Sequence, residues 1–292
     1  MSAVRAAVQG NRGSEPRARG GRRLGTSLAY LTLAIIGIFC LIPFSWPILA
    51  SLDPQAGPYL AVPTQWSLAN FGRLLSDPTW LRLLLNCMSL SGGATIVALA
   101  TSVLGGYALS RFAFRGRRVL LFGILFTRII PASATIAPLY FIVLRLGLAN
   151  TYHGVILVEA AQQLPLTLWM MKGFFDTVPR ELEEAAWIDG ADRLGSAIRI
   201  VLPLAMPGVG AAALFAFIAV WGDFLTPLIL LQSPDLFPIS IGLFRAYIGY
   251  NLVDWGELAA TSILYMLPAI AFYLLVRRYL LRATVVGALQ GT

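Results

Sequence analysis

The chain has 292 residues, of which 58% are apolar and only 12% are charged, and its mean hydropathy is +0.74. Soluble proteins carry roughly a quarter of charged residues, so this composition excludes an ordinary soluble domain. The formal net charge is +8, which alone would suit nucleic acid, but the distribution of the basic residues argues against that partner.

Six long apolar runs predict six membrane-spanning helices. The runs 24–52, 83–110 and 258–276 contain no charge, and three further runs contain one each, at Arg128, Glu159 and Asp223. A spanning helix needs about 20 mostly apolar residues. The predicted class is therefore an all-α polytopic membrane protein. We place its spans at 25–51, 84–108, 119–144, 154–174, 206–231 and 257–279.

The basic residues gather on one side of the predicted membrane. Residues 1–23 hold six arginines, so we expect a disordered basic tail followed by one six-span domain over 24–292. With the first span starting inside, 17 of the 22 basic residues face the cytoplasm, which is the bias of the positive-inside rule. Both termini are therefore predicted to be cytoplasmic, and the basic residues to orient the protein rather than to bind nucleic acid.

Several residue types inside the spans have ordinary interpretations. The first apolar run is too long for a signal peptide and predicts a retained span. Cys40 and Cys87 fall within spans and predict neither a disulfide nor a metal site. Proline interrupts several spans, which membrane helices tolerate when neighbours satisfy the freed backbone groups. The prolines concerned are Pro131, Pro138, Pro165, Pro227 and Pro268.

One hydrophilic segment, which we call the polar loop (177–206), separates the fourth and fifth spans on the cytoplasmic side. Pro179 suits a first helical position and Gly190 a C-terminal cap. Three acids, Glu181, Glu183 and Glu184, lie early in that helix, where the dipole favours anions. A second helix should follow, with one apolar face ended by Pro203 and Pro207. That face consists of Leu194, Ala197, Ile198 and Val201.

The polar loop thus predicts two short helices around a glycine turn, with two interpretations of its apolar face. The face either rests in the lipid headgroup region or docks into a groove of a partner protein.

The residues of the polar loop resemble a known family. Glu184-Ala185-Ala186, then Asp189-Gly190, then Ile200 and Leu202-Pro203 closely resemble the EAA loop of ABC importer permeases. The longer stretch "LPLTLWMMKGFFDTVPRELEEAAWIDGA" resembles that loop in the carbohydrate-uptake branch, of the maltose and glycerol-phosphate type. "PLYFIVLRLGLANTYHG", "WGDFLTPLIL" and "VVGALQG" also resemble this branch. Ala197 departs from the pattern, because these permeases usually carry a bulky aromatic residue there.

The resemblance implies a type I importer permease fold in the bacterial inner membrane, with the polar loop inserted into a cleft of a cytoplasmic ATPase. The chain has no G-x-x-x-x-G-K-[ST] motif, so ATP and Mg²⁺ would bind to two separate ATP-binding subunits and no cofactor to this chain. A second homologous permease, an external solute-binding protein and a sugar or related polyol are the other implied partners. The implied coupling residues are Glu184, Ala185, Ala186, Asp189, Gly190, Ile200, Leu202 and Pro203.

Polar residues inside spans are costly and therefore candidates for function. Glu159, Gln162 and Gln163 share one helical face by their spacing, and their carboxylate and amides suit a hydroxyl-rich solute. Asp223 and Trp221 form a second candidate group for the transport route. The alternative is that such residues hold helices together.

Two further polar residues have specific alternatives. By a rise of about 1.5 Å per residue, Arg128 lies roughly 14 Å and Glu159 roughly 20 Å from the inner face, so we expect Arg128 to be able to reach Glu159 in a structural ion pair. Asn86 is a further route candidate, with interhelical hydrogen bonding as the favoured role.

Other functions remain as alternatives. An importer for another solute, such as a glycerophosphodiester or polyamine, would share the same sequence features. An ion-coupled secondary transporter would also use buried acids, but it would need no EAA loop. No H-E-x-x-H motif or nucleophile elbow is present, so no enzyme is predicted.

Overall fold

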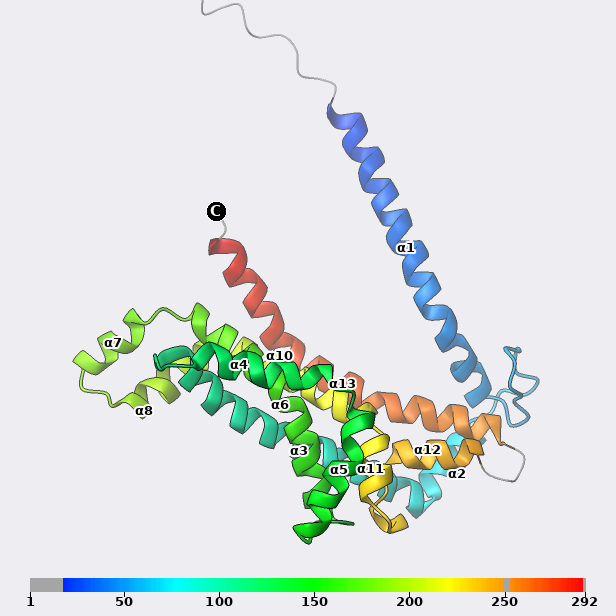
Figure 1. The fold of residues 1–292 in the computed structure, drawn as a ribbon. Helices are drawn as coiled ribbons and strands as arrows, with labels where there is room; N and C mark the ends of the chain where they lie inside the picture. The colour runs from blue at the N-terminus through cyan, green and yellow to red at the C-terminus, as the bar shows by residue number, and fades with distance from the viewer. Residues whose placement is uncertain (1–17, 249–252, 291–292) are drawn as a thin grey trace, which may run out of the picture.

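The computed structural model describes residues 18–248 and 253–290, and within these ranges the chain consists of helices and loops without strands (Figure 1). The predicted all-α class is confirmed. The longer helices are α1 (Ala18–Ser51), α3 (Pro78–Arg111), α5 (Ala132–Arg145), α6 (Tyr152–Thr177), α10 (Met206–Gly222) and α13 (Trp255–Gln290). The shorter ones are α2 (Ala69–Ser76), α4 (Arg117–Phe126), η1 (Thr127–Ile129), α7 (Glu181–Ile188), α8 (Arg193–Ser196), η2 (Ala197–Val201), α9 (Leu202–Leu204), α11 (Leu225–Leu230), η3 (Pro234–Leu236) and α12 (Ile239–Ile248).

The centre of the bundle is the pair α3 and α6, which pack along most of their lengths. Small residues allow this approach. A Cβ atom on Gly106 would lie 2.9 Å from the Met171 Cβ, and one on Gly93 would lie 2.7 Å from the Ile156 Cδ1. Without glycine at these positions the two helices would have to separate, so close contact depends on the small-residue pattern usual between membrane helices.

Helices α10 and α13 complete the bundle through a series of stacked rings. Phe272 stacks on Phe217 at 4.2 Å between centroids, Phe217 on Trp221 at 5.5 Å, and Trp221 on Tyr265 at 5.2 Å. The Trp221 indole N–H also donates to the Tyr265 carbonyl at 3.2 Å. Trp221, a candidate for the transport route, therefore belongs to the packed core between α10 and α13.

The predicted spans correspond to helices of three kinds. In the described part of the chain, Leu28–Ser51, Pro78–Arg111 and Trp255–Tyr279 are single helices long and apolar enough to cross a membrane. Two helix pairs qualify only if each bent pair counts as one span, with bends of 104° between α4 and α5 and 72° between α9 and α10. Helix α6 matches the fourth predicted span in position but is not among the helices long and apolar enough to cross a membrane. The number six thus stays a prediction.

Two spans that we expected to be continuous are broken. The third, 119–144, is divided at Ile130 and Pro131, where the backbone of Ile130 is extended, as a residue before proline prefers. The fifth, 206–231, breaks at Asp223, whose carboxylate accepts from the Leu225 N–H at 2.9 Å. Pro138, Pro165 and Pro268 lie inside unbroken helices.

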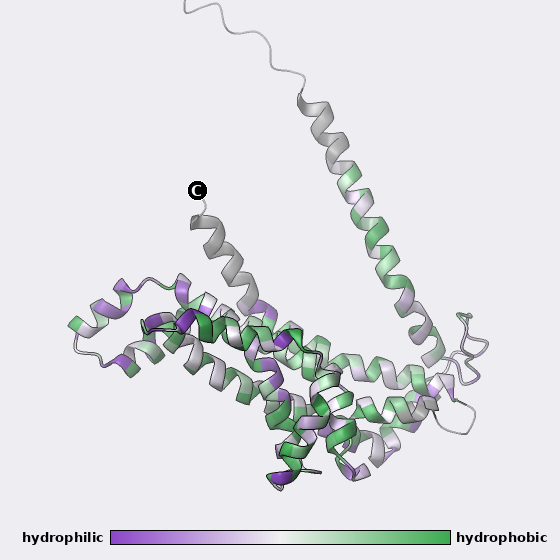
Figure 2. Cartoon of the chain, viewed as in Figure 1, coloured by the Kyte–Doolittle hydropathy of each residue, from purple (hydrophilic) through white to green (hydrophobic). Residues whose placement is uncertain are grey.

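Helix α1 extends away from the bundle (Figure 1). Its C-terminal end contacts the start of α13. There Trp46 meets Trp255 edge to face at 6.0 Å. Most of the described α1 side chains are apolar and exposed, such as Phe39 at 74% and Leu41 at 67% (Figure 2), which suits lipid or a second membrane protein. The helix begins at Ala18, inside the tail expected at 1–23; residues 1–17 lie outside the described ranges.

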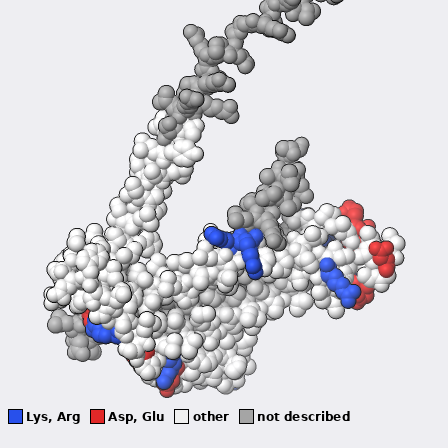
Figure 3. Space-filling model, turned by 180° about the vertical axis from the view of Figure 1, so that it is seen from behind, with Lys and Arg blue, Asp and Glu red and all other residues white. Residues whose placement is uncertain are grey.

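On the face seen in Figure 3, the charged side chains of the described residues form a few separate patches. In Figure 3 most of the visible face is uncharged, and acidic residues gather at the end that carries the polar loop. A largely uncharged face with charge limited to a few patches is the distribution that a lipid environment favours.

Candidate functional site

The polar loop protrudes from one end of the bundle as the helices α7 and α8 (Figure 1). Helix α7 begins at Glu181, after Arg180, so the expectation that Pro179 occupies its first position is wrong. Pro179 instead follows Val178, which is extended and ends α6, because a residue that precedes proline avoids the helical region. The three acids Glu181, Glu183 and Glu184 do lie in the first turn, where the helix dipole favours them.

The turn after α7 is built on Gly190, whose φ is +90°. The Gly190 N–H donates to the Trp187 carbonyl at 3.1 Å and the Ala191 N–H to the Ala186 carbonyl at 2.9 Å. These two bonds form a Schellman motif, which requires a left-handed residue at this position. Asp192 then caps α8 by accepting from the Gly195 N–H at 3.0 Å. The predicted pair of short helices around a glycine turn is confirmed.

A buried ion pair holds the polar loop to the bundle. The Arg111 guanidinium, at the end of α3, donates to the carboxylate of Glu183 in α7, and their side chains are only 8% and 3% exposed. The Tyr107 hydroxyl donates to the same carboxylate at 2.9 Å, and Arg111 donates to the Val178 carbonyl at 3.0 Å. Because both charges are satisfied by several partners, the start of α7 is fixed relative to α3.

Further contacts extend this anchor. The Arg180 guanidinium donates to the Ser110 carbonyl at 2.9 Å, and the Ser110 hydroxyl donates to Asp176 at 2.7 Å. The Arg193 guanidinium lies 5.9 Å from the Phe112 ring and 5.5 Å from the Trp187 ring, within the range of cation–π attraction. Sequence reasoning missed Arg111, Tyr107 and Glu183 as functional residues, since nothing in the local pattern distinguishes Glu183 from the acids beside it.

The outer side of the polar loop carries large apolar side chains that are exposed. The exposed set is Leu182, Trp187, Ile188, Leu194 and Ile198, and Ile188 is the most exposed at 87%. The predicted apolar face is split, because Leu194 and Ile198 are exposed whereas Val201 is fully buried. The π-helical turn η2 (Ala197–Val201) explains the difference, since a π turn shifts the angular register of the residues that follow.

The residues that the family resemblance implicates in coupling occupy different environments. Glu184, Ala185, Asp189, Gly190 and Pro203 are exposed, Ile200 and Leu202 are half-buried, and Ala186 is buried. The loop therefore presents one rigid surface in which a few apolar side chains stand beside exposed acids.

A second candidate site lies at the surface of the bundle, beside the bend between α4 and α5. A hollow of about 380 Å³ opens between η1, α5 and α6, and the polar side chains at its wall are Thr127, Arg128, Thr135 and Gln162. Arg128 donates to the Gln162 carbonyl at 3.0 Å. The half-buried Gln162 amide donates to the Thr226 hydroxyl at 3.4 Å.

The predicted polar stripe on α6 is divided between this hollow and the core. Glu159 is 1% exposed and Gln163 6% exposed, and neither lines the hollow. Gln163, four residues after Glu159, is offset from Glu159 by about 40° around the helix. Gln162, three residues after Glu159, is offset by about 60° in the opposite direction. The hollow covers only a narrow part of the α6 surface, so of the three predicted stripe residues only Gln162 lines it.

The expected ion pair between Arg128 and Glu159 is not formed. Glu159 lies against Asp223 and Thr226, at the break between α10 and α11, and neither of its carboxylate oxygens has a hydrogen-bond donor among the described residues. Arg128 is turned instead to the Gln162 backbone. Glu159 is turned toward Asp223 and Thr226 and Arg128 toward the Gln162 backbone, so comparable depth in the membrane does not bring the two charges together.

The remaining route candidates have structural partners. Asp223 accepts from the Leu225 N–H at 2.9 Å and the Thr226 hydroxyl at 2.5 Å, so it caps the start of α11. Asn86 donates to the Asp235 and Phe237 carbonyls at 2.7 and 3.0 Å. It also accepts from the Tyr152 hydroxyl at 2.7 Å. Asn86 thereby joins α3 to α6 and to the loop before α12.

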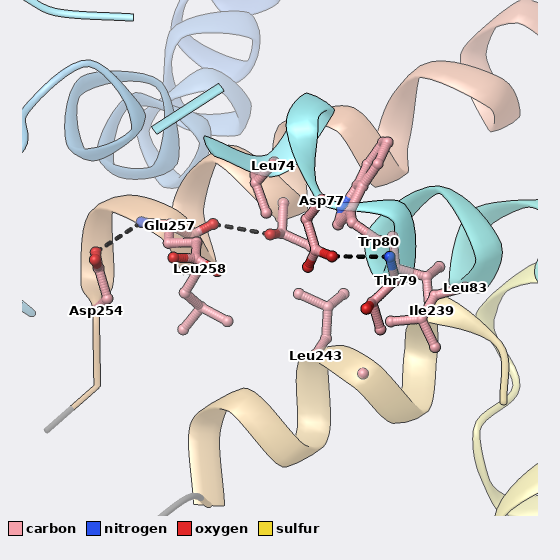
Figure 4. A pocket seen from close by; sticks show the side chains of 12 residues that line it. Leu74, Asp77, Thr79, Trp80, Leu83, Ile239, Leu243, Asp254, Glu257 and Leu258 are labelled. Carbon is pink, nitrogen blue, oxygen red and sulfur yellow. Dashed lines mark hydrogen bonds between the residues drawn. The ribbon is translucent and has the colours of Figure 1, made fainter. Parts of the chain in front are cut away.

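At the opposite end of the bundle from the polar loop, α2, α3, α12 and α13 enclose a pocket of about 260 Å³ (Figure 4). Its three acids already have partners. Asp77 accepts from the Thr79 N–H at 2.8 Å and caps α3, and Asp254 accepts from the Glu257 N–H at 2.9 Å at the start of α13. Arg73 lies 3.0 Å from Asp254 and 3.8 Å from Glu257. These carboxylates hold the helix ends in place.

Together, the apolar bundle and its anchored, protruding loop define a helical membrane protein with several spans and an exposed polar loop at one end. The chain belongs to the family of binding-protein-dependent transport system inner membrane components, whose profile matches residues 101–286. The resemblance seen in the polar loop is thereby confirmed. The family consists of permease subunits of transporters and not of catalytic enzymes, and it places the chain in the inner membrane.

Two relatives illustrate the similarity. The chain is 32% identical over 263 residues to the trehalose/maltose transport system permease protein MalG of Thermococcus litoralis, a match that spans 88% of this chain and 94% of the relative. It is 30% identical over 274 residues to the maltodextrin transport system permease protein MdxG of Bacillus subtilis, spanning 92% and 98%.

A solved structure gives the fold. A chain of a bacterial ABC transporter involved in the import of the acidic polysaccharide alginate matches with a TM-score of 0.77 and 24% identity, over 91% of this chain and 99% of that one. The chain therefore has the fold of type I ABC importer permeases.

Proposed function

We propose that this chain is one of two membrane permease subunits of an ATP-driven importer for a sugar or related polyol. The names of the relatives support a sugar, because the two described above are permeases of trehalose/maltose and maltodextrin transport systems. An external solute-binding protein would deliver the solute, and two separate ATP-binding subunits would drive its passage.

The observation that carries the proposal is the anchored apolar surface of the polar loop. An exposed cluster that includes Ile188 and Leu194 is unfavourable in water unless a partner covers it. The buried pair of Arg111 and Glu183 keeps this surface in a fixed position relative to α3. A helix that fills a partner's groove and is rigidly joined to the bundle can transmit movement of that partner to the spans.

The breaks in the spans supply places where the bundle can change shape. The 104° bend at Pro131 and the break at Asp223 each divide a predicted span into helices that pack against α6. ATP binding and hydrolysis in the partner subunits would shift the bundle between inward-open and outward-open states, because the two states bind that partner differently. The solute would pass between the two permeases by this alternation.

The orientation follows from the basic residues, of which 17 of 22 lie on one side in the six-span arrangement. Both termini and the polar loop would then face the cytoplasm, and the pocket around Asp77 the outside. Cysteine at Ser76, an exposed position next to that pocket, should react with a membrane-impermeant maleimide in intact cells in a Cys40→Ser background. Labelling only after lysis would reverse the orientation.

The proposal is tested by reconstituting the complete transporter in liposomes. Uptake of a radiolabelled maltodextrin or another sugar taken from a panel should require both ATP and the solute-binding protein. An ion-coupled transporter would instead accumulate solute in response to an imposed proton or sodium gradient without ATP. Gradient-driven uptake without ATP would refute the importer assignment.

A further inference from the structure

Arg128 is a basic residue within the third predicted span that has no acid beside it among the described residues. We infer that Arg128 and Gln162 form a binding subsite for the acidic group of the transported solute, so that the substrate is an acidic sugar. This inference rests on the proposed function, which names a sugar but not its charge.

The position of Arg128 puts its charge deep in the bilayer. It lies in η1, eleven residues after Arg117 at the start of α4, which corresponds to about 16 Å along a helix. The hydrocarbon core is about 30 Å thick. A charged side chain at such a depth faces a cavity or a counter-charge almost without exception.

The counter-charge does not come from the described part of this chain. No carboxylate there forms an ion pair with Arg128, and Glu159 on α6 is turned toward Asp223 and Thr226. A guanidinium has five N–H donors, of which one binds the Gln162 carbonyl at 3.0 Å. The side chain is exposed, so its remaining donors are available to a ligand in the hollow.

The rest of the hollow suits a hydroxylated anion. Its walls are mainly apolar, with Ile130, Leu139 and Val158 among them, as is usual for solute sites with a few placed polar groups. The hydroxyls of Thr127 and Thr135 donate to backbone carbonyls and keep lone pairs that can accept from sugar hydroxyls. Arginine is the only charged residue at this wall within the described part of the chain, and its planar fork matches a carboxylate.

The test measures the electrostatic potential in the hollow and does not require the solute to be identified. Thr135→Cys introduces a reporter at the wall in a Cys40→Ser background, and Cys87 stays because it is buried. The assembled transporter in nanodiscs is treated with anionic sulfonatoethyl methanethiosulfonate or with its cationic trimethylammonioethyl counterpart. Rates are normalised to those of a free thiol, and Arg145→Gln is the matched control because Arg145 is exposed at the end of α5, outside the hollow.

We expect the anionic reagent to react about fivefold faster than the cationic one, a factor typical of one nearby charge in a partly shielded site. Arg128→Gln should abolish the preference, whereas Arg128→Lys and Arg145→Gln should keep it. Glucuronate should slow the reaction, and glucose at equal concentration should not.

Three results would overturn the inference. Absence of reaction with both reagents would mean that lipid fills the hollow, and equal rates would mean that an acid of another subunit neutralises Arg128. Equal protection by both sugars, or by neither, would refute an acidic substrate. Stimulation of ATP hydrolysis by the solute-binding protein, measured on the same samples, reports the proposed function separately, so the subsite can fail while the importer assignment stands.

Discussion

Arg111 and Arg128 show how the same side chain serves two regions of this molecule in opposite ways. Arg111 is 8% exposed and its guanidinium is bound by the Glu183 carboxylate and the Val178 carbonyl. Arg128 is exposed and, within the described ranges, binds only a backbone carbonyl. A buried charge that is paired within the chain, such as Arg111, holds the polar loop in a fixed position relative to α3. An exposed charge without an acidic partner, such as Arg128 in the hollow, is available to bind a ligand.

The helices around the two arginines differ in the same sense. The polar loop is fastened to α3 and α6, the tightest helix pair of the bundle. The hollow lies beside the sharpest bend, between α4 and α5. Rigid coupling at one place and a deformable wall at the other are what an importer needs, because a movement received at the loop must change the shape of the route.

The largest effect is expected when the closed charge pair is broken. Glu183→Ala leaves Arg111 buried and unpaired, which costs about 3–5 kcal/mol of stability. The melting temperature of the purified transporter should fall and its ATP-binding subunits should dissociate. Glu181→Ala, in the same helical turn but exposed, is the matched control and should change stability by less than about 0.5 kcal/mol. Equal melting temperatures for the two variants would show that the pair does not anchor the loop.

The glycine turn should contribute less than the charge pair. Gly190→Ala forces a side chain into a left-handed conformation, with φ at +90°, at a cost of about 1–2 kcal/mol. Retention of the ATP-binding subunits during purification should decrease. Gly173→Ala is the control, because Gly173 lies within α6 and a Cβ there meets nothing within 4 Å. A loss of retention in the Gly173 variant as large as in the Gly190 variant would contradict this account of the turn.

Variants of the two glutamines of α6 distinguish a residue that lines the transport route from a residue of the packed core. Gln162→Ala should lower uptake several-fold without lowering the yield of the complex, since Gln162 lines the hollow. Gln163→Ala should lower yield and uptake together, since Gln163 is buried and its loss leaves a cavity costing about 1 kcal/mol or more. Measured uptake per purified complex distinguishes these outcomes. Unchanged uptake in the Gln162 variant would remove that residue from the route.

The smallest effect is expected at Glu159. Its side chain is buried and does not line the hollow, and the amide of Glu159→Gln keeps the side-chain shape and can donate to Asp223, so uptake per purified complex should stay nearly unchanged. Loss of transport with Glu159→Gln, at normal yield, would mean that a negative charge at Glu159 is required.

Local chemistry made part of the structure predictable. The apolar runs located α1, α3 and α13, and the left-handed turn at Gly190 followed from its place after an acidic helix start. These features depend on residues close in sequence, where spacing, capping and hydropathy decide the outcome.

Features that depend on tertiary packing were not predictable. Pro131 breaks a span, whereas Pro138 and Pro165 lie inside continuous helices, because the surrounding packing decides whether a proline bends the chain. The contact of Arg111 with Glu183 joins residues 72 positions apart, and no local pattern marks it. The absence of an ion pair between Arg128 and Glu159 likewise depends on the groups toward which each side chain is turned.

The central claim is that the exposed apolar surface of the polar loop binds the ATP-binding subunits. Ile188 is the most exposed member of that surface, at 87%, and Ile188→Glu should strongly reduce the amount of ATP-binding subunit that copurifies with an affinity-tagged form of this chain. Leu146→Glu is the control, because Leu146 is 65% exposed in the turn between α5 and α6, away from the loop, and its variant should retain the subunits. Full copurification with Ile188→Glu would contradict the claim.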